Sequence, residues 1–259
     1  FKQKTAYEIS LGLVGSEMCI RDRYNVEHPL PELTEEAVYG LTELHRAEIA
    51  GSGLVANPGC YPTGAILALA PAVKAGIIDP DVIVDGKSGV SGAGRGLGLN
   101  THYSEVNESV RAYSMDGHRH LPEITQELRL ASNQEARVTF LPHLIPMTRG
   151  ILSSCYASLK PGALPRGEAG IGVLREVYED YYREENFVKV MSEPPHTKHT
   201  LGNNDCIIYP TIDVRTDRLT VVSAIDNLVK GAAGQAVQNM NVMFGLPEDM
   251  GLKALALYP

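Results

Sequence analysis

The pattern of apolar and polar residues predicts short strands that alternate with amphipathic helices. Apolar runs of four to nine residues, bounded by turn residues, are typical of strands, and a 3.6-residue apolar period is typical of helices. The expected strands cover residues 53–56, 82–85, 137–143, 151–159, 187–190, 206–209 and 219–225. The expected helices cover residues 62–70, a segment from 122 onward, 171–183 and 229–243, with Pro71 ending the first. Mixed strands joined by long crossings indicate an α+β fold.

One turn in this pattern brings a cysteine to the start of a helix. Pro58 and Gly59 form a turn dipeptide directly before Cys60, and Pro62 suits a first helical turn. Unpaired N–H groups and the helix dipole at such a position favour the thiolate, which is the nucleophilic form of cysteine. The alternative interpretation is a buried structural cysteine, because free cysteine is among the most buried residue types. The local sequence leaves both interpretations open.

Two further segments carry residues suited to chemistry. Residues 86–96 combine many glycines with two serines and with Lys87 and Arg95, so their backbone N–H groups are predicted to form an anion-binding nest. A flexible surface loop is the alternative. His118 and His120 flank an arginine just before the helix that begins near Pro122, and histidine is the usual acid or base near neutral pH. A solvated turn would explain them equally.

The remaining candidate residues have structural interpretations. Cys155 and Cys206 lie inside predicted strands and are expected in the core, whereas His28 and His45 are expected to be solvated. Asp226 or Asn227 is placed to cap the last helix. The basic segment 194–200 could line a site.

Composition narrows the class of partner. The 259 residues carry a net charge of −8, which argues against nucleic acids and anionic membranes. The hydrophobic content of 44% suffices for a large core, and no uninterrupted apolar run has the length of a transmembrane helix. The four cysteines form no C-x-x-C pair, so we expect no metal site, a reducing compartment and a cytoplasmic location.

The first 23 residues are interpreted separately. Residues 2–8 and 13–22 can both be back-translated, in one frame, into the constant parts of a transposase-type sequencing adaptor. Residues 1–23 are therefore predicted to be adaptor-derived and are excluded from fold reasoning, together with Cys19. The gene segment is expected to begin at Tyr24 and to be truncated.

Several long blocks together carry a family resemblance. They are ANPGCYPTGAILALAP, GKSGVSGAGR, HRHLPEI, LPHLIPMTRGI and AIDNLVKGAAGQAVQNMNVMFGLPEDMGL. In this order they resemble the N-acetyl-gamma-glutamyl-phosphate reductase family over residues 24–259. More distantly, the cysteine turn and the segment around Asp226 are similar to those of aspartate-semialdehyde and glyceraldehyde-3-phosphate dehydrogenases.

The resemblance implies a domain organisation. Residues 24–58 would be the remnant of a Rossmann dinucleotide-binding domain that has lost its glycine-rich turn. Residues 59–225 would form a catalytic and dimerisation domain like that of glyceraldehyde-3-phosphate dehydrogenase, with a mixed or antiparallel sheet. Residues 226–259 would form a C-terminal helix and tail that return to the cofactor domain. The chain alone is then expected to bind NADPH weakly and to be inactive.

The resemblance also implies a reaction and its residues. An NADPH-dependent reductase of this family converts N-acetyl-L-glutamyl 5-phosphate to the 5-semialdehyde in arginine biosynthesis. Cys60 would form the thioester, and His120, or else His118, would be the acid or base. Asn227 would contact the nicotinamide, with Lys230 and Gly231 as further cofactor candidates. By their chemistry, Ser88, Gly89, Ser91 and Arg95 are candidates for substrate binding.

The expected partners are a small-molecule substrate and further copies of the chain, in a dimer or tetramer. Two alternatives remain. One is an enzyme resembling aspartate-semialdehyde dehydrogenase, and the other is a catalytically silent domain that only associates with itself.

Overall fold

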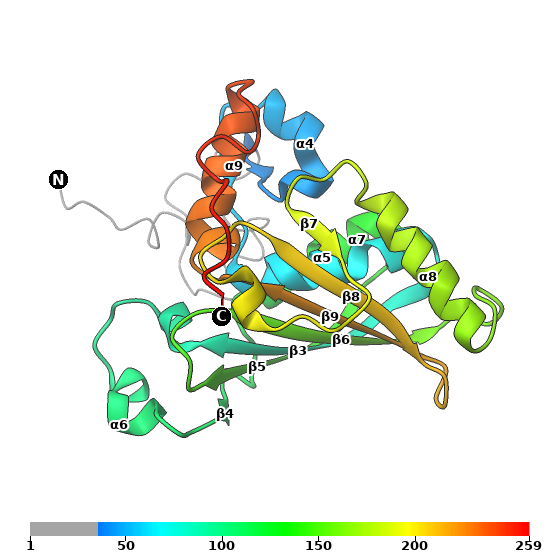
Figure 1. The fold of residues 1–259 in the computed structure, drawn as a ribbon, viewed down its shortest axis with the longest axis horizontal. Helices are drawn as coiled ribbons and strands as arrows, with labels where there is room; N and C mark the ends of the chain where they lie inside the picture. Colours follow the sequence, from blue (N-terminus) through cyan, green and yellow to red (C-terminus); the bar gives the residue numbers. More distant parts are fainter. Residues whose placement is uncertain (1–35, 259) are drawn as a thin grey trace.

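A seven-stranded mixed sheet forms the centre of the protein (Figure 1). The computed structural model describes residues 36–258, so the predicted adaptor segment and His28 lie outside the described residues. The strand order is β4-β5-β3-β6-β9-β8-β7, and β3 pairs parallel with β5 but antiparallel with β6. The strands are β3 (Ile78–Gly89), β4 (Arg111–Ala112), β5 (Arg137–Ile145), β6 (Ile151–Leu159), β7 (Val188–Val190), β8 (Cys206–Asp213) and β9 (Arg218–Ile225). The predicted α+β class is confirmed.

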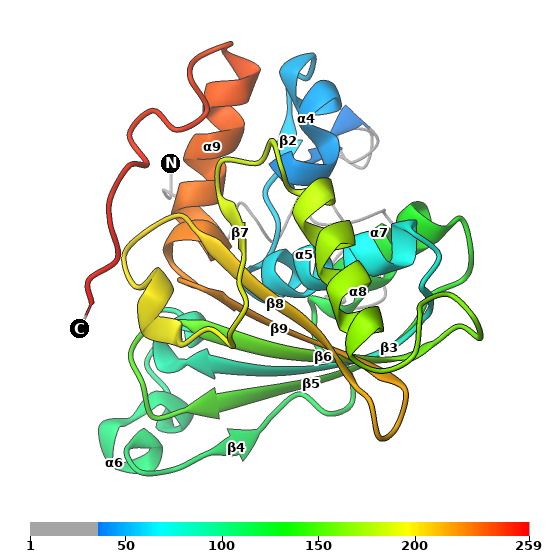
Figure 2. The same cartoon turned by 45° about the vertical axis from the view of Figure 1, so that its right-hand side comes forward.

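Three helices pack on one face of this sheet (Figures 1 and 2). They are α5 (Cys60–Lys74), α7 (Leu121–Ser132) and α8 (Glu168–Tyr181). The apolar side of the sheet and these helices enclose the main core, in which α5 is buried along nearly its whole length. Cys155 and Cys206 are fully buried in it, as predicted. The core therefore fixes α5, and with it Cys60, against the sheet.

A smaller group of elements lies at one end of the sheet (Figure 2). A two-stranded parallel pair, β1 (Val38–Tyr39) and β2 (Val55–Ala56), flanks α4 (Thr42–Ala50). Helix α4 packs against α9 (Gly234–Met243), which follows the π-helical turn η4 (Val229–Ala233). Asp226 caps this segment, because its carboxylate accepts the N–H groups of Leu228 and Val229.

The segment between β3 and α7 projects from the sheet edge. It contains the short helices η1 (Val90–Ala93), η2 (Leu99–Thr101) and α6 (Tyr103–Val106), while η3 (Thr197–Thr200) follows β7.

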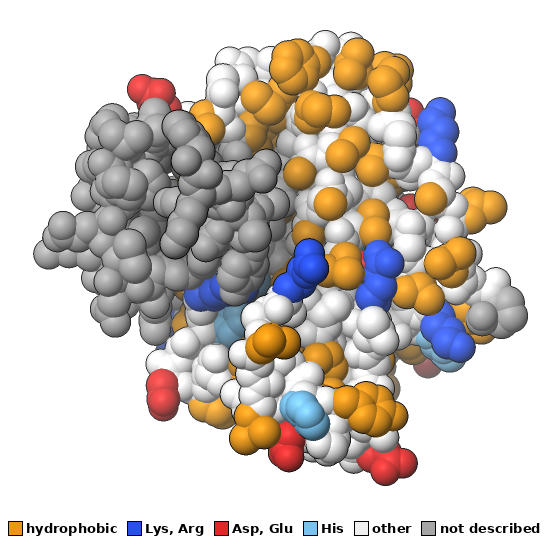
Figure 3. Space-filling view, turned by 90° about the vertical axis from the view of Figure 1, so that its left-hand side faces the viewer, with side chains coloured by type: hydrophobic (Ala, Val, Ile, Leu, Met, Phe, Trp, Pro, Cys, Tyr) orange, Lys and Arg blue, Asp and Glu red, His pale blue; other side chains and the backbone are white. Residues whose placement is uncertain are grey.

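Figure 3 shows an exposed apolar region, where orange side chains gather on the upper part of the face that carries α9. Large exposed apolar residues of α9 and the segment after it include Met240, Phe244 and Leu246. Among residues 36–258, no helix is both long and apolar enough to cross a membrane.

The prediction that Pro71 ends its helix is wrong, because α5 continues to Lys74. Proline lacks the N–H that would bond to the carbonyl four residues earlier, here that of Leu67. The Tyr182 hydroxyl donates to that carbonyl at 2.6 Å, across 115 positions of sequence. A helix stops at proline for two reasons, the missing hydrogen bond and the clash of the ring with the preceding turn. The distant Tyr182 hydroxyl removes the first reason, because it satisfies the freed carbonyl.

This compensation gives a stability prediction. Replacing Tyr182 with Phe should lower the free energy of unfolding by about 1–3 kcal/mol, because the buried Leu67 carbonyl loses its donor. Adding Pro71→Ala should return much of this loss, since alanine restores the N–H. Urea unfolding of the single and double variants measures the coupling, with the neighbouring Tyr181→Phe as the matched control. Equal effects of Tyr182→Phe with and without Pro71 would contradict the explanation.

The sheet also extends further than the apolar pattern predicts. Strand β3 runs from Ile78 to Gly89, so Lys87 belongs to a strand and not to the glycine-rich loop. Its ammonium pairs with Asp85 at 2.6 Å. The glycine at 86 is required by packing, because a Cβ there would lie 2.5 Å from the Tyr61 ring. Strand pairing with β5 and β6 therefore extends into residues that local composition favours as a loop.

Candidate active site

Cys60 is the first residue of α5, directly after the predicted turn. Cys60 is half-buried, and the backbone N–H groups of Cys60 and Tyr61 lower the pKa of its thiol. The turn is tied down on both sides. The Gly59 N–H donates to Glu123 at 2.8 Å, and the Asn57 amide donates to the carbonyl of Ala232 at 3.1 Å. The cysteine is therefore held between the start of α7 and the turn η4.

Both candidate histidines lie beside this turn, just before α7. The ring centroids of His118 and His120 are 4.7 Å apart, and the backbone N–H of His120 donates to Nδ1 of His118 at 3.1 Å. His120 Nε2 is the ring atom next to the cysteine turn, because a Cβ built on Gly59 would lie only 2.6 Å from it. The structure thus brings together Cys60 and the histidine block, and it places His120 against the residue that precedes the cysteine.

The electrostatics of the cysteine differ from the sequence-based prediction. Burial raises the pKa of the Cys60 thiol to about 11, although Arg119 and the two backbone N–H groups act in the opposite direction. The prediction of a favoured thiolate is therefore wrong for the free protein, because desolvation outweighs the helix start. A neighbouring base is needed to remove the thiol proton near pH 7.

The two histidines have lowered pKa values. Burial and the nearby Arg119 lower the pKa of His118 to about 4. Burial, His118 and Arg119 also lower the pKa of His120 well below its ordinary value. Both imidazoles are consequently neutral at pH 7, which is the form that acts as a general base.

A carboxylate that the sequence reasoning did not single out completes the cluster. Glu123 is fully buried, and its Oε2 accepts both the Gly59 N–H and the Tyr39 hydroxyl at 2.8 Å. Burial raises its pKa to about 7, against these two hydrogen bonds. Its position three residues after His120, one helical turn into α7, was the available signal.

The raised pKa of Glu123 predicts a pH-dependent stability. The fold favours the protonated form of Glu123. Its contribution to the free energy of unfolding is therefore fully present below the unfolded-state pKa of about 4.5 and is lost as the pH rises through about 7. Relative to Glu123→Gln, the wild type should lose on the order of 3 kcal/mol between pH 4.5 and 8. Urea unfolding at both pH values measures this difference. A constant difference, or the same trend in the exposed Glu179→Gln control, would contradict it.

Three N–H groups of the glycine-rich segment are already used within the protein. The N–H groups of Gly89, Val90 and Ser91 donate to the carbonyls of the facing residues 150, 147 and 148. The Ser88 hydroxyl is buried and donates to the Gly89 carbonyl at 2.9 Å. Ser88 and Gly89 therefore use these donors within the protein, and their role in substrate binding stays a prediction.

Two of the four substrate candidates remain at an open cavity. Ser91 and the exposed Arg95 line a cavity of about 520 Å³ with the apolar residues Leu97, Tyr103 and Met147. Cys60 is not among the residues that line this cavity. Asn227 lies next to this cavity, because its amide donates to Ser91 Oγ at 2.9 Å.

The three cofactor candidates have different surroundings. Asn227 is buried, and its Oδ1 accepts the Gly150 N–H at 2.7 Å. Its Nδ2 carries two hydrogens, of which the contact with Ser91 uses one, so the amide retains a donor for a ligand. Gly231 packs directly on Cys60, where a Cβ would lie 2.8 Å from the cysteine Cβ. Lys230 is fully buried in an ion pair with Glu43, and its role in cofactor binding stays a prediction.

His45 is also placed differently from the prediction. It is part-buried, and its Nε2 lies 2.6 Å from Glu127 Oε2, so it is not a solvated surface residue. Both Tyr39 and His45 thus connect the β1–α4 segment to acidic residues of α7.

Comparisons with known proteins define the class. A family model described as "Semialdehyde dehydrogenase, dimerisation domain" matches residues 60–227. Aspartate semialdehyde dehydrogenase II from Vibrio cholerae has a similar fold, with a TM-score of 0.62 over 82% of this chain and 69% of that chain at 16% identity. The cysteine turn and this fold place the protein in the semialdehyde dehydrogenase class.

Sequence similarity defines the family. The N-acetyl-gamma-glutamyl-phosphate reductase of Dehalococcoides mccartyi is 57% identical over 237 residues, which are 91% of this chain and 68% of the relative. That of Pelotomaculum thermopropionicum is 58% identical over 239 residues, covering 91% and 67%. The chain belongs to the N-acetyl-gamma-glutamyl-phosphate reductase family and spans about two thirds of the length of these relatives. It is an oxidoreductase of a class that uses a nicotinamide cofactor.

Proposed function

We propose that the chain provides the acyl-transfer centre for NADPH-dependent reduction of N-acetyl-L-glutamyl 5-phosphate to N-acetyl-L-glutamate 5-semialdehyde and phosphate. One observation carries this proposal beyond family membership. Cys60, at a helix start, directly follows Gly59, which packs against His120 and donates its N–H to Glu123. A nucleophile with a neighbouring base is the arrangement that covalent acyl transfer requires.

In the proposed first step, neutral His120 accepts the thiol proton as the Cys60 sulfur attacks the acyl carbon. The carbon–oxygen bond to phosphate breaks, phosphate leaves with that electron pair, and a thioester forms on Cys60. In this proposal, the backbone N–H groups of Cys60 and Tyr61, which act on the sulfur in the free protein, stabilise negative charge on the acyl oxygen. Glu123 acts by holding the turn through the Gly59 N–H.

In the second step, NADPH supplies a hydride to the thioester carbon when it is bound. Asn227, with its remaining amide hydrogen, is our candidate to orient the nicotinamide. His120 returns its proton to the acyl oxygen to complete a thiohemiacetal. Loss of that proton and cleavage of the carbon–sulfur bond release the semialdehyde and restore the thiol on Cys60.

A homo-oligomer in the cytoplasm, dimeric or tetrameric, belongs to the same proposal. The match to a dimerisation domain supports the oligomer.

The acylation step tests this function without a cofactor. The protein is incubated with N-acetyl-L-glutamyl phosphate, generated from N-acetyl-L-glutamate and ATP by a kinase, and its mass is followed. We expect one hydroxylamine-sensitive N-acetylglutamyl group per chain. The same measurement with aspartyl phosphate tests the alternative of an aspartate-semialdehyde dehydrogenase. Acylation by neither compound would contradict the proposal, and preferential acylation by aspartyl phosphate would replace the substrate.

A further inference from the structure

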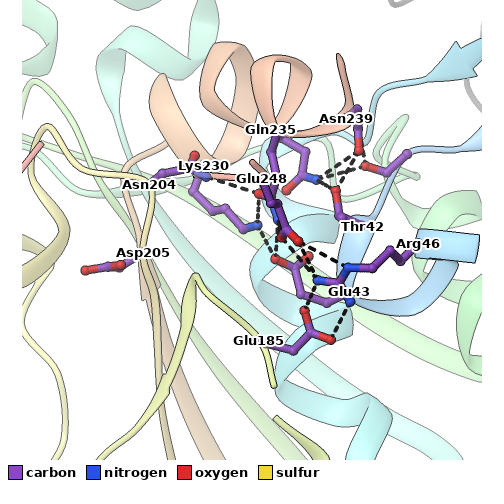
Figure 4. A network of polar contacts seen from close by, with 12 residues as sticks. Thr42, Glu43, Arg46, Glu185, Asn204, Asp205, Lys230, Gln235, Asn239 and Glu248 are labelled. Atoms are coloured by element: carbon purple, nitrogen blue, oxygen red, sulfur yellow. Dashed lines mark hydrogen bonds and ion pairs between the residues drawn. The ribbon is translucent and has the colours of Figure 1, made fainter. Parts of the chain in front are cut away.

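A fully buried lysine directly precedes the glycine that packs on Cys60. Lys230 is fully buried, and its ammonium donates to Glu43 Oε1 at 2.6 Å and to Gln238 Oε1 at 2.8 Å (Figure 4). Glu43 is also completely buried as a side chain. The pair joins α4, which carries Glu43, to η4, which carries Lys230, and to α9, which carries Gln238.

The same network continues outward through further charges. Gln238 Nε2 donates to both Glu43 and Glu248, and Arg46 donates to Glu248 and Glu185. Oxygens of the three glutamates lie within 4.8 Å of one another, which is a spacing that could suit a metal ion. Arg46 and Lys230 already pair with them, so the protein's own cations compensate this cluster. We therefore interpret it as a structural network and not as a metal site.

The turn that carries Lys230 is in direct contact with the cysteine. Lys230 lies in the π-helical turn η4, and such turns are frequent at functional sites. The next residue, Gly231, packs so closely that a Cβ on it would lie 2.8 Å from Cys60 Cβ and 3.2 Å from its Cα. The Gly231 N–H donates to the Asp226 carbonyl at 3.0 Å, which fixes the other end of the turn. A displacement of Lys230 would therefore move Gly231 and change its contact with Cys60.

We propose that Lys230 is a positioning residue, which holds η4 against Cys60 through its buried ion pair with Glu43. Removal of one partner leaves an uncompensated buried charge, so the local structure rearranges to solvate it. The rearrangement moves Gly231 away from the cysteine and opens the thiol to water. The catalytic meaning of this role rests on the proposed function of Cys60, whereas the contact itself does not.

The experiment compares the reactivity of three cysteines in the Lys230→Met variant. The protein is treated with iodoacetamide at pH 8, and peptide mass mapping gives the alkylation rate at Cys60, Cys155 and Cys206. Local opening of η4 should raise the Cys60 rate by about tenfold or more and leave Cys155 unchanged, because the charges of Lys230 and Glu43 act on the thiol of Cys206 but not on that of Cys155. Global destabilisation would instead raise all three rates together, because unfolding exposes every thiol.

Two further variants complete the design. Lys189→Met removes a lysine from an exposed ion pair with Asp205 and should change none of the three rates. Glu43→Gln keeps the shape of the partner but removes its charge, so it should raise the Cys60 rate selectively even if Lys230→Met does not fold. An unchanged Cys60 rate, or a parallel rise at all three cysteines, would overturn the positioning role. Because alkylation needs neither substrate nor cofactor, these outcomes are independent of whether acylation occurs.

Discussion

Replacing Cys60 with Ser should reduce acylation by N-acetyl-L-glutamyl phosphate by on the order of 10³-fold or more, because the nucleophile is removed. The alcohol of serine is much less acidic than a thiol, and the proposed base is a neutral imidazole of low pKa. The measurement is the initial rate at which the hydroxylamine-sensitive N-acetylglutamyl mass appears on the protein. The rate should fall while the far-ultraviolet circular dichroism spectrum and urea midpoint stay close to those of the wild type.

The matched control is Cys155→Ser, which changes a core thiol in β6 by the same single atom. It should lower the stability but leave the acylation rate per folded molecule unchanged, since Cys155 is fully buried away from the turn. Retention of near-normal acylation in Cys60→Ser would refute the assignment of the nucleophile. A loss in Cys155→Ser of the same size would mean that the reaction reports folding and not chemistry.

The sequence predicts the elements of this fold well where the period of apolar residues is decisive. Strand β6 has the predicted bounds of 151 and 159, since its residues alternate between the core and the open face. Helix α7 begins one residue before Pro122, as its first-turn proline indicates. The domain boundaries implied by the family resemblance stay predictions.

Where the structure differs from the local pattern, the cause is a partner distant in sequence. Pro71 does not end α5, and Tyr182 supplies the missing donor. Lys230 forms a buried ion pair with Glu43, 187 positions away. Three N–H groups of the glycine-rich segment donate to carbonyls of residues 147–150. Composition near one position indicates which chemistry is possible there, but long-range contacts decide which groups remain available.

The residue set of the site shows the same limit. The cysteine turn and the histidine block are visible as local motifs, and the fold brings them together. Glu123 and Tyr39 are not, because a helical glutamate and a tyrosine are ordinary in sequence and become notable only through their shared contact beneath the turn. The pKa of Cys60 was likewise misjudged, since a helix start indicates a favourable dipole but gives no measure of burial.

Replacing His120 with Asn should lower the acylation rate at pH 7 by about 10²–10⁴-fold, the usual contribution of a general base. The effect should depend on pH. In the wild type, the rate should fall only when the pH drops through the lowered pKa of His120, below its ordinary value of 6.5. Without this base, the rate should instead rise steadily with pH towards the Cys60 pKa of about 11, because only the spontaneously formed thiolate reacts.

The matched variant is His118→Asn, which changes the neighbouring ring of the same block. Its effect should be much smaller and should keep the wild-type pH profile, because His118 bonds to the His120 backbone while His120 Nε2 lies against Gly59. A larger loss in His118→Asn, accompanied by loss of the low-pH limb, would transfer the role of the base to His118. If neither variant changed the pH profile, the proton of Cys60 would have to leave by another group, and Glu123, whose carboxylate accepts the Gly59 N–H, would be the next residue to replace.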